Sequence, residues 1–267
     1  MIGDFAKLLP LVEPGPELSD VDRERFARHE PIPELGWLGQ RRLRAAKVCV
    51  VGAGGLGSPA LMYLAAAGVG TLGVVDADAV ELVNLQRQVL HTTAGIGSRK
   101  AVSAAAAIAA LDPGIAVRVH DERLTAANAA QILGAYDLVL DAVDNYPTRY
   151  LIVDTCADLG IPVVWGAVRV TRAQVSVFWS RPRSGEGPVA GITLRDLYPE
   201  PPDPATWVTA AAVGVLGAMC GQVGALMASE AIKLITGAGE VLFGRVWYLD
   251  AMTARVAEIP FTPRRDT

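Results

Sequence analysis

The stretch that decides the fold runs from residue 47 to residue 88 and reads KVCVVGAGGLGSPALMYLAAAGVGTLGVVDADAVELVNLQRQ. Its first apolar run, Val48–Val51, is short, β-branched and followed by glycines, which predicts a buried parallel strand. A helix over Ser58–Ala67 and a second strand over Thr71–Val75 complete a β-α-β unit. The pattern predicts an α/β fold of the Rossmann-like, doubly wound type, built on a largely parallel sheet.

The glycines between the first strand and the helix indicate a nucleotide site. Gly52, Gly54 and Gly57 follow the spacing G-x-G-x-x-G, with Gly55 among them. Such glycines let the backbone approach a phosphate and aim the helix N-terminus at it. Asp76 ends the second strand, nineteen residues past Gly57, where an acid can hold a ribose hydroxyl. This fingerprint predicts nucleotide binding but does not by itself distinguish NAD from ATP.

Polar side chains after the second strand favour ATP. Asn84, Arg87 and Gln88 follow this strand, and Lys100 lies in the sequence GSRK at the start of an Ala-rich helix. A triphosphate spreads more negative charge than a pyrophosphate, and an Arg, a Lys and an amide donor suit its outer phosphates. Isolated basic residues are usually solvated surface charges. The ATP interpretation therefore depends on their position beside the fingerprint.

A second acidic segment follows the apolar strand expected over Tyr136–Leu140. Asp144 lies at the carboxyl end of this strand, the edge where open α/β sheets bind ligands. Asp141, three residues earlier, is a structural alternative. A strand-end Asp can also cap a helix, but Asn145 and Thr148 are alternative caps here. We therefore expect Asp144 to be a ligand residue.

Spaced motifs along the chain resemble those of the ThiF/MoeB family, the bacterial relatives of ubiquitin-activating enzymes. They are, in order, GAGGLGS, D-x-D-x-V-E-x-x-N-L-x-R-Q at 76–88, GSRK at 97–100, DAVDNYPTRY at 141–150, WGAVRVTRAQVSVF at 165–178, LYPEPP at 197–202, SEAIKLITGAGE at 229–240 and GRVWYLDAMT at 244–253. The resemblance implies an adenylation domain over residues 25–267, with a crossing loop over about 181–207. Residues 1–24, broken by prolines, are expected to form a flexible N-terminal extension.

The resemblance implies ATP-dependent adenylation with Mg2+. The C-terminal Gly-Gly carboxylate of a small ubiquitin-like (β-grasp) sulfur-carrier protein attacks the α-phosphate, pyrophosphate leaves, and a separate sulfur donor later forms a thiocarboxylate. A homodimer is implied, in which Arg28 reaches the partner's ATP site and acts in catalysis together with Arg87, Lys100 and Asp144. Asp144 would bind the Mg2+, and Arg149 is open to a structural ion pair. The implied nucleotide-binding residues are Gly52, Gly54, Gly55, Gly57, Asp76, Asn84, Arg87, Gln88, Lys100, Asp144 and Asn145.

The sequence departs from the family's pattern in its metal and thiol residues. Many members carry zinc on two C-x-x-C pairs, but the first pair's positions here are Thr193 and Asp196, and the tail PFTPRRDT has no cysteine. We therefore expect no zinc site. The loop cysteine of some relatives corresponds to Ala210, which puts thioester transfer in doubt but leaves adenylation possible. The cysteines present are interpreted as buried small apolar residues: Cys49, Cys156 and Cys220.

Composition narrows the remaining classes. A chain of 267 residues that is 51% hydrophobic can bury a large core, and its net charge of −4 argues against nucleic-acid binding as a main task. Three scattered cysteines and no secretory leader predict a cytoplasmic protein. We interpret Val213–Ala228 as a buried helix near a dimer interface rather than a membrane span. Residues 19–44 are expected to be helical, and Arg245–Asp250 with Arg255–Ile259 to form an antiparallel C-terminal hairpin.

Other functions remain open from the sequence. The substrate could be a peptide or a pathway-specific carrier of secondary metabolism, and the carrier could serve molybdenum cofactor, thiamine, cysteine or tRNA thiolation. An NAD-binding oxidoreductase is compatible with the fingerprint, but no His–Asp pair is evident, and we interpret His29, His91 and His120 as surface or capping residues. An inactive carrier-binding module is a third possibility, disfavoured by intact Arg87, Lys100 and Asp144.

Overall fold

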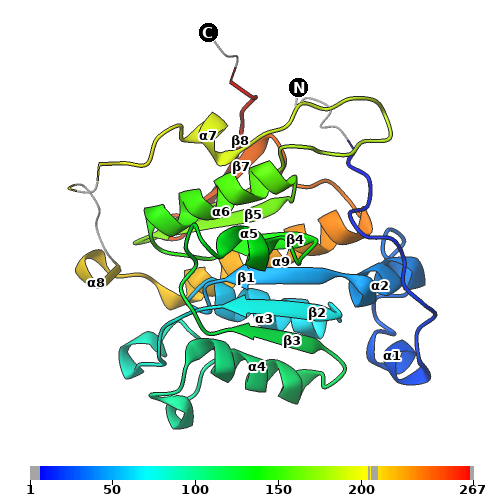
Figure 1. Ribbon diagram of the computed structural model, residues 1–267, viewed down its shortest axis with the longest axis horizontal. Helices are drawn as coiled ribbons and strands as arrows, with labels where there is room; N and C mark the ends of the chain where they lie inside the picture. The colour runs from blue at the N-terminus through cyan, green and yellow to red at the C-terminus, as the bar shows by residue number, and fades with distance from the viewer. Residues whose placement is uncertain (1–6, 204, 206–209, 265–267) are drawn as a thin grey trace.

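The centre of the fold is an eight-stranded β-sheet. The computed structural model describes residues 7–203, 205 and 210–264. The strand order is β3-β2-β1-β4-β5-β6-β7-β8 (Figure 1). The strands are β1 (Lys47–Val51), β2 (Thr71–Val75), β3 (Ala116–His120), β4 (Leu138–Asp141), β5 (Val163–Arg169), β6 (Arg172–Phe178), β7 (Arg245–Asp250) and β8 (Arg255–Pro260).

The sheet is parallel in its first part and antiparallel in its second. The strands from β3 to β5 pair in parallel, whereas β5–β6, β6–β7 and β7–β8 pair antiparallel. The chain moves outward to β2 and β3 on one side of β1, then crosses to β4 on the other side. This arrangement confirms the predicted fold class, and it places a topological switch point between β1 and β4, where open α/β sheets bind ligands.

Helices cover both faces of the sheet. Helices α5 and α6 lie together on the near face of the sheet in Figure 1, and α9 lies behind the sheet. Helices α2 and α3 pack on α9, and α4 packs on α3. The helices are α1 (Asp20–Arg25), α2 (Gly36–Ala45), α3 (Gly57–Ala66), α4 (Lys100–Leu111), α5 (Ala129–Leu133), α6 (Tyr146–Leu159), α7 (Leu194–Leu197), α8 (Ala210–Val213) and α9 (Gly217–Thr236), with short 3-10 turns η1 (Leu82–Asn84) and η2 (Thr93–Gly95). Between these layers β1 and β4 are almost wholly buried.

The prediction that residues 19–44 are helical is confirmed at both ends of the range and wrong between them. Helix α1 ends at Arg25 and α2 begins only at Gly36. Pro31 and Pro33 lie between them and cannot continue a helix, and Gly36 has a φ of +50°, which a glycine adopts without strain. Arg28 therefore lies in the turn after α1 and is exposed.

Helix α9 is the one helix of the described chain that is long and apolar enough to cross a membrane by length and composition. Its apolar side is mostly buried within the subunit, through residues such as Val223, Met227 and Leu234. Gly224 allows α3 to approach closely, because a Cβ there would lie 2.4 Å from Pro59 Cγ. The helix is therefore part of the core, as the sequence predicts, but it begins at Gly217 rather than Val213 and ends at Thr236 rather than Ala228.

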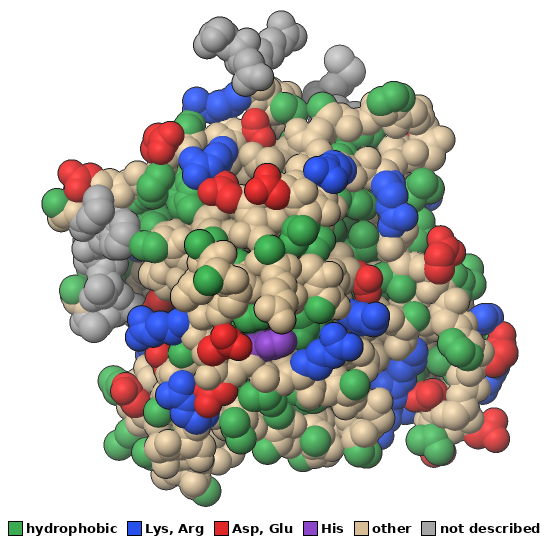
Figure 2. Space-filling model, viewed as in Figure 1, with side chains coloured by type: hydrophobic (Ala, Val, Ile, Leu, Met, Phe, Trp, Pro, Cys, Tyr) green, Lys and Arg blue, Asp and Glu red, His purple; other side chains and the backbone are tan. Residues whose placement is uncertain are grey.

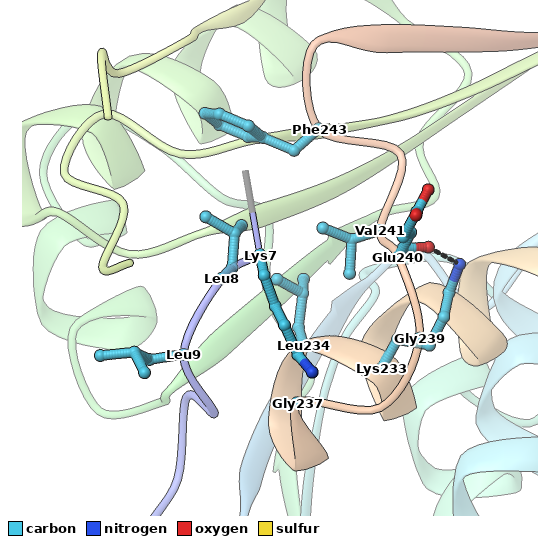
Figure 3. A pocket seen from close by; sticks show the side chains of 10 residues that line it. All are labelled: Lys7, Leu8, Leu9, Lys233, Leu234, Gly237, Gly239, Glu240, Val241 and Phe243. Atoms are coloured by element: carbon cyan, nitrogen blue, oxygen red, sulfur yellow. Dashed lines mark hydrogen bonds between the residues drawn. The ribbon is translucent and has the colours of Figure 1, made fainter. Parts of the chain in front are cut away.

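The described part of the predicted N-terminal extension lies across the end of α9. Leu9 N donates to Arg183 O at 2.8 Å, and Leu11 N donates to Leu234 O at 2.9 Å. A pocket opens beside this segment, lined by side chains from the segment, from the end of α9 and from the loop before β7 (Figure 3). Since α9 has 20 residues and is about 30 Å long, this pocket is far from the glycine-rich turn near its first residues.

Charges of both signs are interspersed on the face shown in Figure 2. Lys and Arg side chains alternate with Asp and Glu, and no broad field of one sign covers that face. Such a surface suits solubility better than the tracking of a nucleic-acid backbone.

Candidate nucleotide and acyl-transfer site

The glycine-rich turn follows β1 at the centre of the sheet. Gly52 has a φ of +97°, and a Cβ at Gly57 would lie 1.8 Å from Gly52 O. Neither position therefore accepts a side chain without displacing backbone. A Cβ at Gly52 would also lie 2.8 Å from Ala142 O, so the turn packs directly against the segment that leads to Asp144. The start of α3 at Gly57 is thereby brought to the switch point, where its N-terminus can face an anion.

Asp76 holds the turn from the end of β2. Its Oδ2 accepts a hydrogen bond from Ala53 N at 2.8 Å, and its Oδ1 accepts one from Asp78 N at 2.8 Å. A carboxylate has four lone-pair sites, so each oxygen keeps capacity for a ribose hydroxyl. The side chain is partly exposed, which agrees with a residue that both orders the turn and faces a ligand.

The side chains of η1 and the loop after it gather against the glycines. Arg87 Nη2 donates to Asn84 Oδ1 at 3.0 Å, and Arg87 Cδ lies 3.5 Å from where a Cβ on Gly55 would be. Gln88 Nε2 lies 3.7 Å from the corresponding point on Gly54. Gln88 is buried, and its Oε1 has no hydrogen-bond partner among the described residues. The predicted cluster of Asn84, Arg87 and Gln88 is thus assembled at the turn.

Lys100 is buried at the start of α4 and forms an ion pair with Asp78, which the sequence analysis did not name as a site residue. Its Nζ lies 3.1 Å from Asp78 Oδ2, and its backbone N donates to Asp78 O at 2.9 Å. Asp78 is itself tied to Asp76. The ammonium group is therefore oriented toward the same edge as the turn, and its aliphatic stem is removed from solvent. The D-x-D spacing at 76–78 was the available signal for Asp78.

The two candidate acids after β4 have different environments. Asp141 is fully buried, and its Oδ2 accepts from Arg149 Nε at 3.0 Å. Arg149 Nη2 also donates to Val143 O at 2.7 Å and Gly166 O at 3.1 Å. Burial raises the Asp141 pKa, while the Arg149 charge opposes this shift. Asp141 and Arg149 thus form a structural ion pair, which leaves Asp144 as the acid available to a ligand.

Asp144 is exposed and without a hydrogen-bond or ion-pair partner in the described part of the chain. Asn145, not Asp144, caps α6: its Oδ1 accepts from Thr148 N at 3.0 Å. A solvated carboxylate beside a phosphate site fits Mg2+, which is usually held by one or two carboxylates plus substrate phosphates and waters. No group of three or more His, Cys, Asp or Glu side chains forms a metal cage in the described residues.

His91 was misinterpreted from the sequence as a surface or capping residue. Only 5% of it is exposed. Its Nε2 lies 2.9 Å from Ala53 O in the glycine-rich turn, and its Nδ1 lies 2.9 Å from Ser103 Oγ on α4. Nothing in the local pattern QVLHTT indicates this contact, because Ala53 is 38 residues away in the chain.

Arg28 lies far from the glycine-rich turn of this chain. The neighbouring Phe26 packs at the end of α3, since a Cβ on Gly68 would lie 2.4 Å from Phe26 Cζ. His29 Nδ1 is 2.7 Å from Gln40 Oε1, and Gln40 Nε2 donates to Ala67 O. The ten residues of α3 separate this end from Gly57 by about 15 Å, more than an arginine side chain can span.

Comparison with known proteins identifies the family. The model of the ThiF family matches residues 26–267. The chain belongs to the ThiF family. It is 49% identical over 262 residues to a Mycobacterium tuberculosis protein named "Probable adenylyltransferase/sulfurtransferase MoeZ", covering 96% of this chain and 66% of that protein. It is 46% identical over 243 residues to the sulfur carrier protein adenylyltransferase of Thermus thermophilus, covering 91% of this chain and 88% of that protein.

Solved structures share the fold of this ThiF-family chain. The crystal structure of PaaA superposes with a TM-score of 0.73 at 23% identity, covering 92% of this chain and 75% of PaaA. At this identity the likeness concerns the fold alone. It agrees with a parallel sheet extended by antiparallel strands.

Thr193 and Asp196, the positions at which the sequence analysis expected a cysteine pair to be missing, belong to a polar cluster. Thr193 and Asp196 form a capping box at the start of α7. Asp196 Oδ2 accepts from Thr193 N at 2.7 Å and Thr193 Oγ1 at 3.0 Å, while its Oδ1 accepts from Arg264 N at 2.8 Å. One carboxylate therefore joins the crossing loop to the C-terminal tail. Residues 204, 206 and 207 of the predicted loop, and residues 1–6 of the predicted extension, lie outside the described residues.

The three cysteines of this ThiF-family chain are buried and free, as predicted. Burial raises the pKa of the Cys156 thiol to about 12 and also raises those of Cys49 and Cys220. A thiol with a raised pKa is a poor nucleophile. Cys220 nevertheless lies close to the nucleotide turn, 3.0 Å from where a Cβ on Gly55 would be.

Proposed function

We propose that this protein adenylates the C-terminal Gly-Gly carboxylate of a small ubiquitin-like (β-grasp) sulfur-carrier protein, using ATP and Mg2+ and releasing pyrophosphate. The observation that carries the proposal is the gathering of Arg87, Asn84 and Lys100 around the glycine-rich turn and Asp76. A dinucleotide site has no need of these cations, whereas a triphosphate does. The named relatives are adenylyltransferases, and that of T. thermophilus acts, by its name, on a sulfur carrier.

The proposed reaction is a substitution at the α-phosphorus of ATP. A carboxylate oxygen of the carrier forms a bond to this phosphorus, the bond to the bridging α–β oxygen breaks, and its electron pair leaves with pyrophosphate. Because no proton has to be removed from a carboxylate, the protein's main tasks are alignment and charge stabilisation. Gly52, Gly54, Gly55 and Gly57 would line the phosphates and Asp76 the ribose.

The cationic and amide side chains have distinct proposed roles. Arg87, with Asn84 bonded to its guanidinium, would bind the outer phosphates, and Lys100 would approach them from α4. Gln88, whose buried Oε1 lacks a partner among the described residues, would contact the nucleotide. Asp144, with Asn145 beside it, would hold Mg2+, which neutralises charge on the phosphates during their departure.

We propose that the protein binds no structural zinc. Thr193 and Asp196 lie where the first cysteine pair was expected. Their side chains form a capping box with each other, and Asp196 also accepts a hydrogen bond from Arg264 N. These oxygen groups cannot form the thiolate site that structural zinc prefers. Position 210 offers no thiol either, so the adenylate would be passed to a separate sulfur donor rather than to a loop cysteine.

We further propose a homodimer in which Arg28 acts in the partner's site. The distance from Arg28 to its own turn, about the length of α3, supports action in trans. Within the stretch Val213–Ala228, which was expected near the interface, six residues of α9 are buried, so its first residues are the ones left for pairing. The start of α9 packs on the loop after η1, since a Cβ on Gly217 would lie 2.2 Å from Gln86 O. The exposed apolar side chains of η1, of this loop and of the segment before α9 suit an interface: Leu82, Val83, Val89, Val213 and Leu216.

Pyrophosphate exchange tests the proposed function. Purified protein should incorporate labelled pyrophosphate into ATP when given a β-grasp carrier ending in Gly-Gly, and not when that carrier lacks the two glycines. Exchange with a short peptide in place of the carrier would favour the peptide-activating alternative. Binding of NAD without binding of ATP would favour an oxidoreductase, and carrier binding without exchange would favour an inactive module. We expect the reaction to take place in the cytoplasm.

A further inference from the structure

The imidazole of His91 lies under the glycine-rich turn and contacts two elements of the nucleotide site. It comes from the loop between η1 and α4 and is almost fully buried. One ring nitrogen faces Ala53 O of the turn and the other faces Ser103 Oγ of α4, each at 2.9 Å. It is thus a side chain that joins the turn to the helix that begins with Lys100.

The partner of Nε2 and the burial of the ring together favour one protonation state. A carbonyl oxygen only accepts hydrogen bonds, so Nε2 carries the proton that is donated to Ala53 O. Nδ1 then accepts the hydroxyl proton of Ser103, and a neutral imidazole satisfies both contacts. Burial lowers the pKa of His91 and outweighs the Ala53 hydrogen bond, which raises it, while the charges of Lys100 and Asp76 act in opposite directions.

Ala53 is the residue whose backbone is held from both sides. Its N donates to Asp76 Oδ2 at 2.8 Å, and its O accepts from His91. These two bonds fix the peptide groups before and after Ala53, and with them the direction of the turn. Ala53 O also accepts from Ser58 Oγ, but at 3.4 Å. Without the bond from the ring the carbonyl would keep only this longer contact, and the loss of its better hydrogen bond is costly in a protein interior.

We propose that His91 is a positioning residue for ATP: through Ala53 and Ser103 it holds the glycine-rich turn and the Lys100 end of α4 in one fixed arrangement. The ring touches neither the nucleotide nor the carrier. This inference rests on the proposed function, because it concerns how the ATP site is built.

Steady-state pyrophosphate exchange with four variants tests the role. His91→Phe keeps the ring volume and removes the donor, His91→Gln restores a donor at the end of the side chain, and Ser103→Ala removes the second contact. His120→Phe is the matched control, since His120 is also half-buried and hydrogen-bonded, to Tyr136 Oη at 2.7 Å, away from the turn. Thermal unfolding of each variant and calorimetric titration with ATP accompany the kinetics.

The two KM values separate positioning from a general structural defect. We expect His91→Phe to raise the KM and Kd for ATP about tenfold, which corresponds to about 1.4 kcal/mol, with the KM for the carrier unchanged. His91→Gln should return ATP affinity to within about threefold of the wild type, Ser103→Ala should lose about threefold, and His120→Phe should lose none. A merely structural role would reduce the fraction of active protein and hence kcat, while leaving both KM values unaltered.

Each outcome decides between the alternatives. Wild-type ATP affinity in His91→Phe, or an equal loss in His91→Gln, overturns the inference while leaving the proposed function in place. If the wild type itself binds no ATP, the proposed function fails and this inference fails with it. Should His91→Phe not fold, Ser103→Ala decides: about threefold weaker ATP binding supports the inference and wild-type affinity overturns it.

Nitrogen NMR of histidine-labelled protein gives an independent readout. His91 should show the neutral Nε2–H tautomer at pH 7, and its Nε2 resonance should shift on ATP binding because the turn tightens around the phosphates. A proton on Nδ1, or an Nε2 resonance indifferent to ATP, would show that the ring does not hold Ala53 in the way proposed.

Discussion

Replacing the two acids after β4 one at a time should separate stability from catalysis. Asp141 is buried against Arg149, whereas Asp144 is exposed and has no partner in the described part of the chain. Asp141→Ala would leave the Arg149 guanidinium buried without its carboxylate, although its bonds to Val143 O and Gly166 O remain. Asp144→Ala removes no contact that the structure shows. We therefore expect opposite phenotypes from residues only three positions apart.

The magnitudes follow from the two environments. Breaking one side of a buried ion pair costs about 3–5 kcal/mol. For 267 residues, an unfolding entropy of about 2.1 cal/mol/K per residue gives about 0.56 kcal/mol/K, so Asp141→Ala should lower Tm by about 5–9 °C. A change at an exposed site alters stability by about 0.5 kcal/mol or less, so Asp144→Ala should shift Tm by no more than about 1 °C. For the loss of a magnesium ligand we expect a cost like that of a removed oxyanion-hole donor, about 2.7–4 kcal/mol of transition-state stabilisation or about 10²- to 10³-fold in exchange rate.

Calorimetry and pyrophosphate exchange, run on the same preparations, measure both effects. Asp144→Asn is a useful companion variant because it keeps the size of the side chain and removes its charge. Exchange within a few-fold of the wild type in Asp144→Ala would refute the metal role of Asp144. A Tm drop of several degrees in that variant would refute the argument from exposure, and a stable Asp141→Ala would show that the ion pair with Arg149 contributes little.

Three further predictions concern zinc, the dimer and acid stability. Elemental analysis of purified protein should find no stoichiometric zinc; zinc that survives mild chelation would mean that a site has formed from other ligands. Arg28→Ala and Asp144→Ala should each be nearly inactive, and mixed dimers of the two should regain one working site, whereas verified subunit exchange without recovery would place Arg28 outside the partner's site. Burial raises the pKa of Asp22, but the hydrogen bonds from Arg44 and Ser19 and the Arg44 charge outweigh burial and lower the pKa. Asp22→Asn should therefore reduce the free energy of unfolding by up to about 1 kcal/mol at pH 7. The difference from the wild type should narrow as pH falls below about 4, which urea unfolding at several pH values can measure.

The elements set by local pattern were predictable. The predicted bounds of the first two strands and of the helix between them differ from the observed ones by a residue at most, because β-branched residues, glycines and alanines favour one conformation at each place. The same holds for the C-terminal hairpin. The break between α1 and α2 was not predicted, although Pro31 and Pro33 indicate it. The reason is that the polar composition on both sides of the prolines suits a helix equally well.

The site was predictable where residues follow strand ends and not where side chains meet across the fold. Asp76 comes directly after β2, so the sheet brings it to the ligand edge. Asn84 and Arg87 follow in η1 and the loop after it, close enough in the sequence for their position beside the turn to be predicted. Two other contacts of the site depend on how distant segments meet in the fold. His91 contacts Ala53, and Lys100 contacts Asp78. His91 has no partner near it in the sequence, so the sequence gives no signal of its contact with Ala53, and its interpretation as a surface or capping residue was wrong.

Thr193 and Asp196, the positions at which the resemblance led us to expect cysteines, show how two polar residues connect segments that are distant in the sequence. From the sequence, Thr193 and Asp196 are only two missing thiolates. In the structure, Asp196 closes a capping box with Thr193 and at the same time accepts a bond from Arg264 N, so one carboxylate satisfies two helix-start donors and a donor of the C-terminal tail. The T-x-x-D spacing indicates the cap, but the third bond needs the tail to return from β8 to the start of α7, which only the fold determines. The Asp196 carboxylate thus links the segment at α7 to the C-terminal tail, beside other contacts of the same segment such as Tyr150 Oη donating to Tyr198 O.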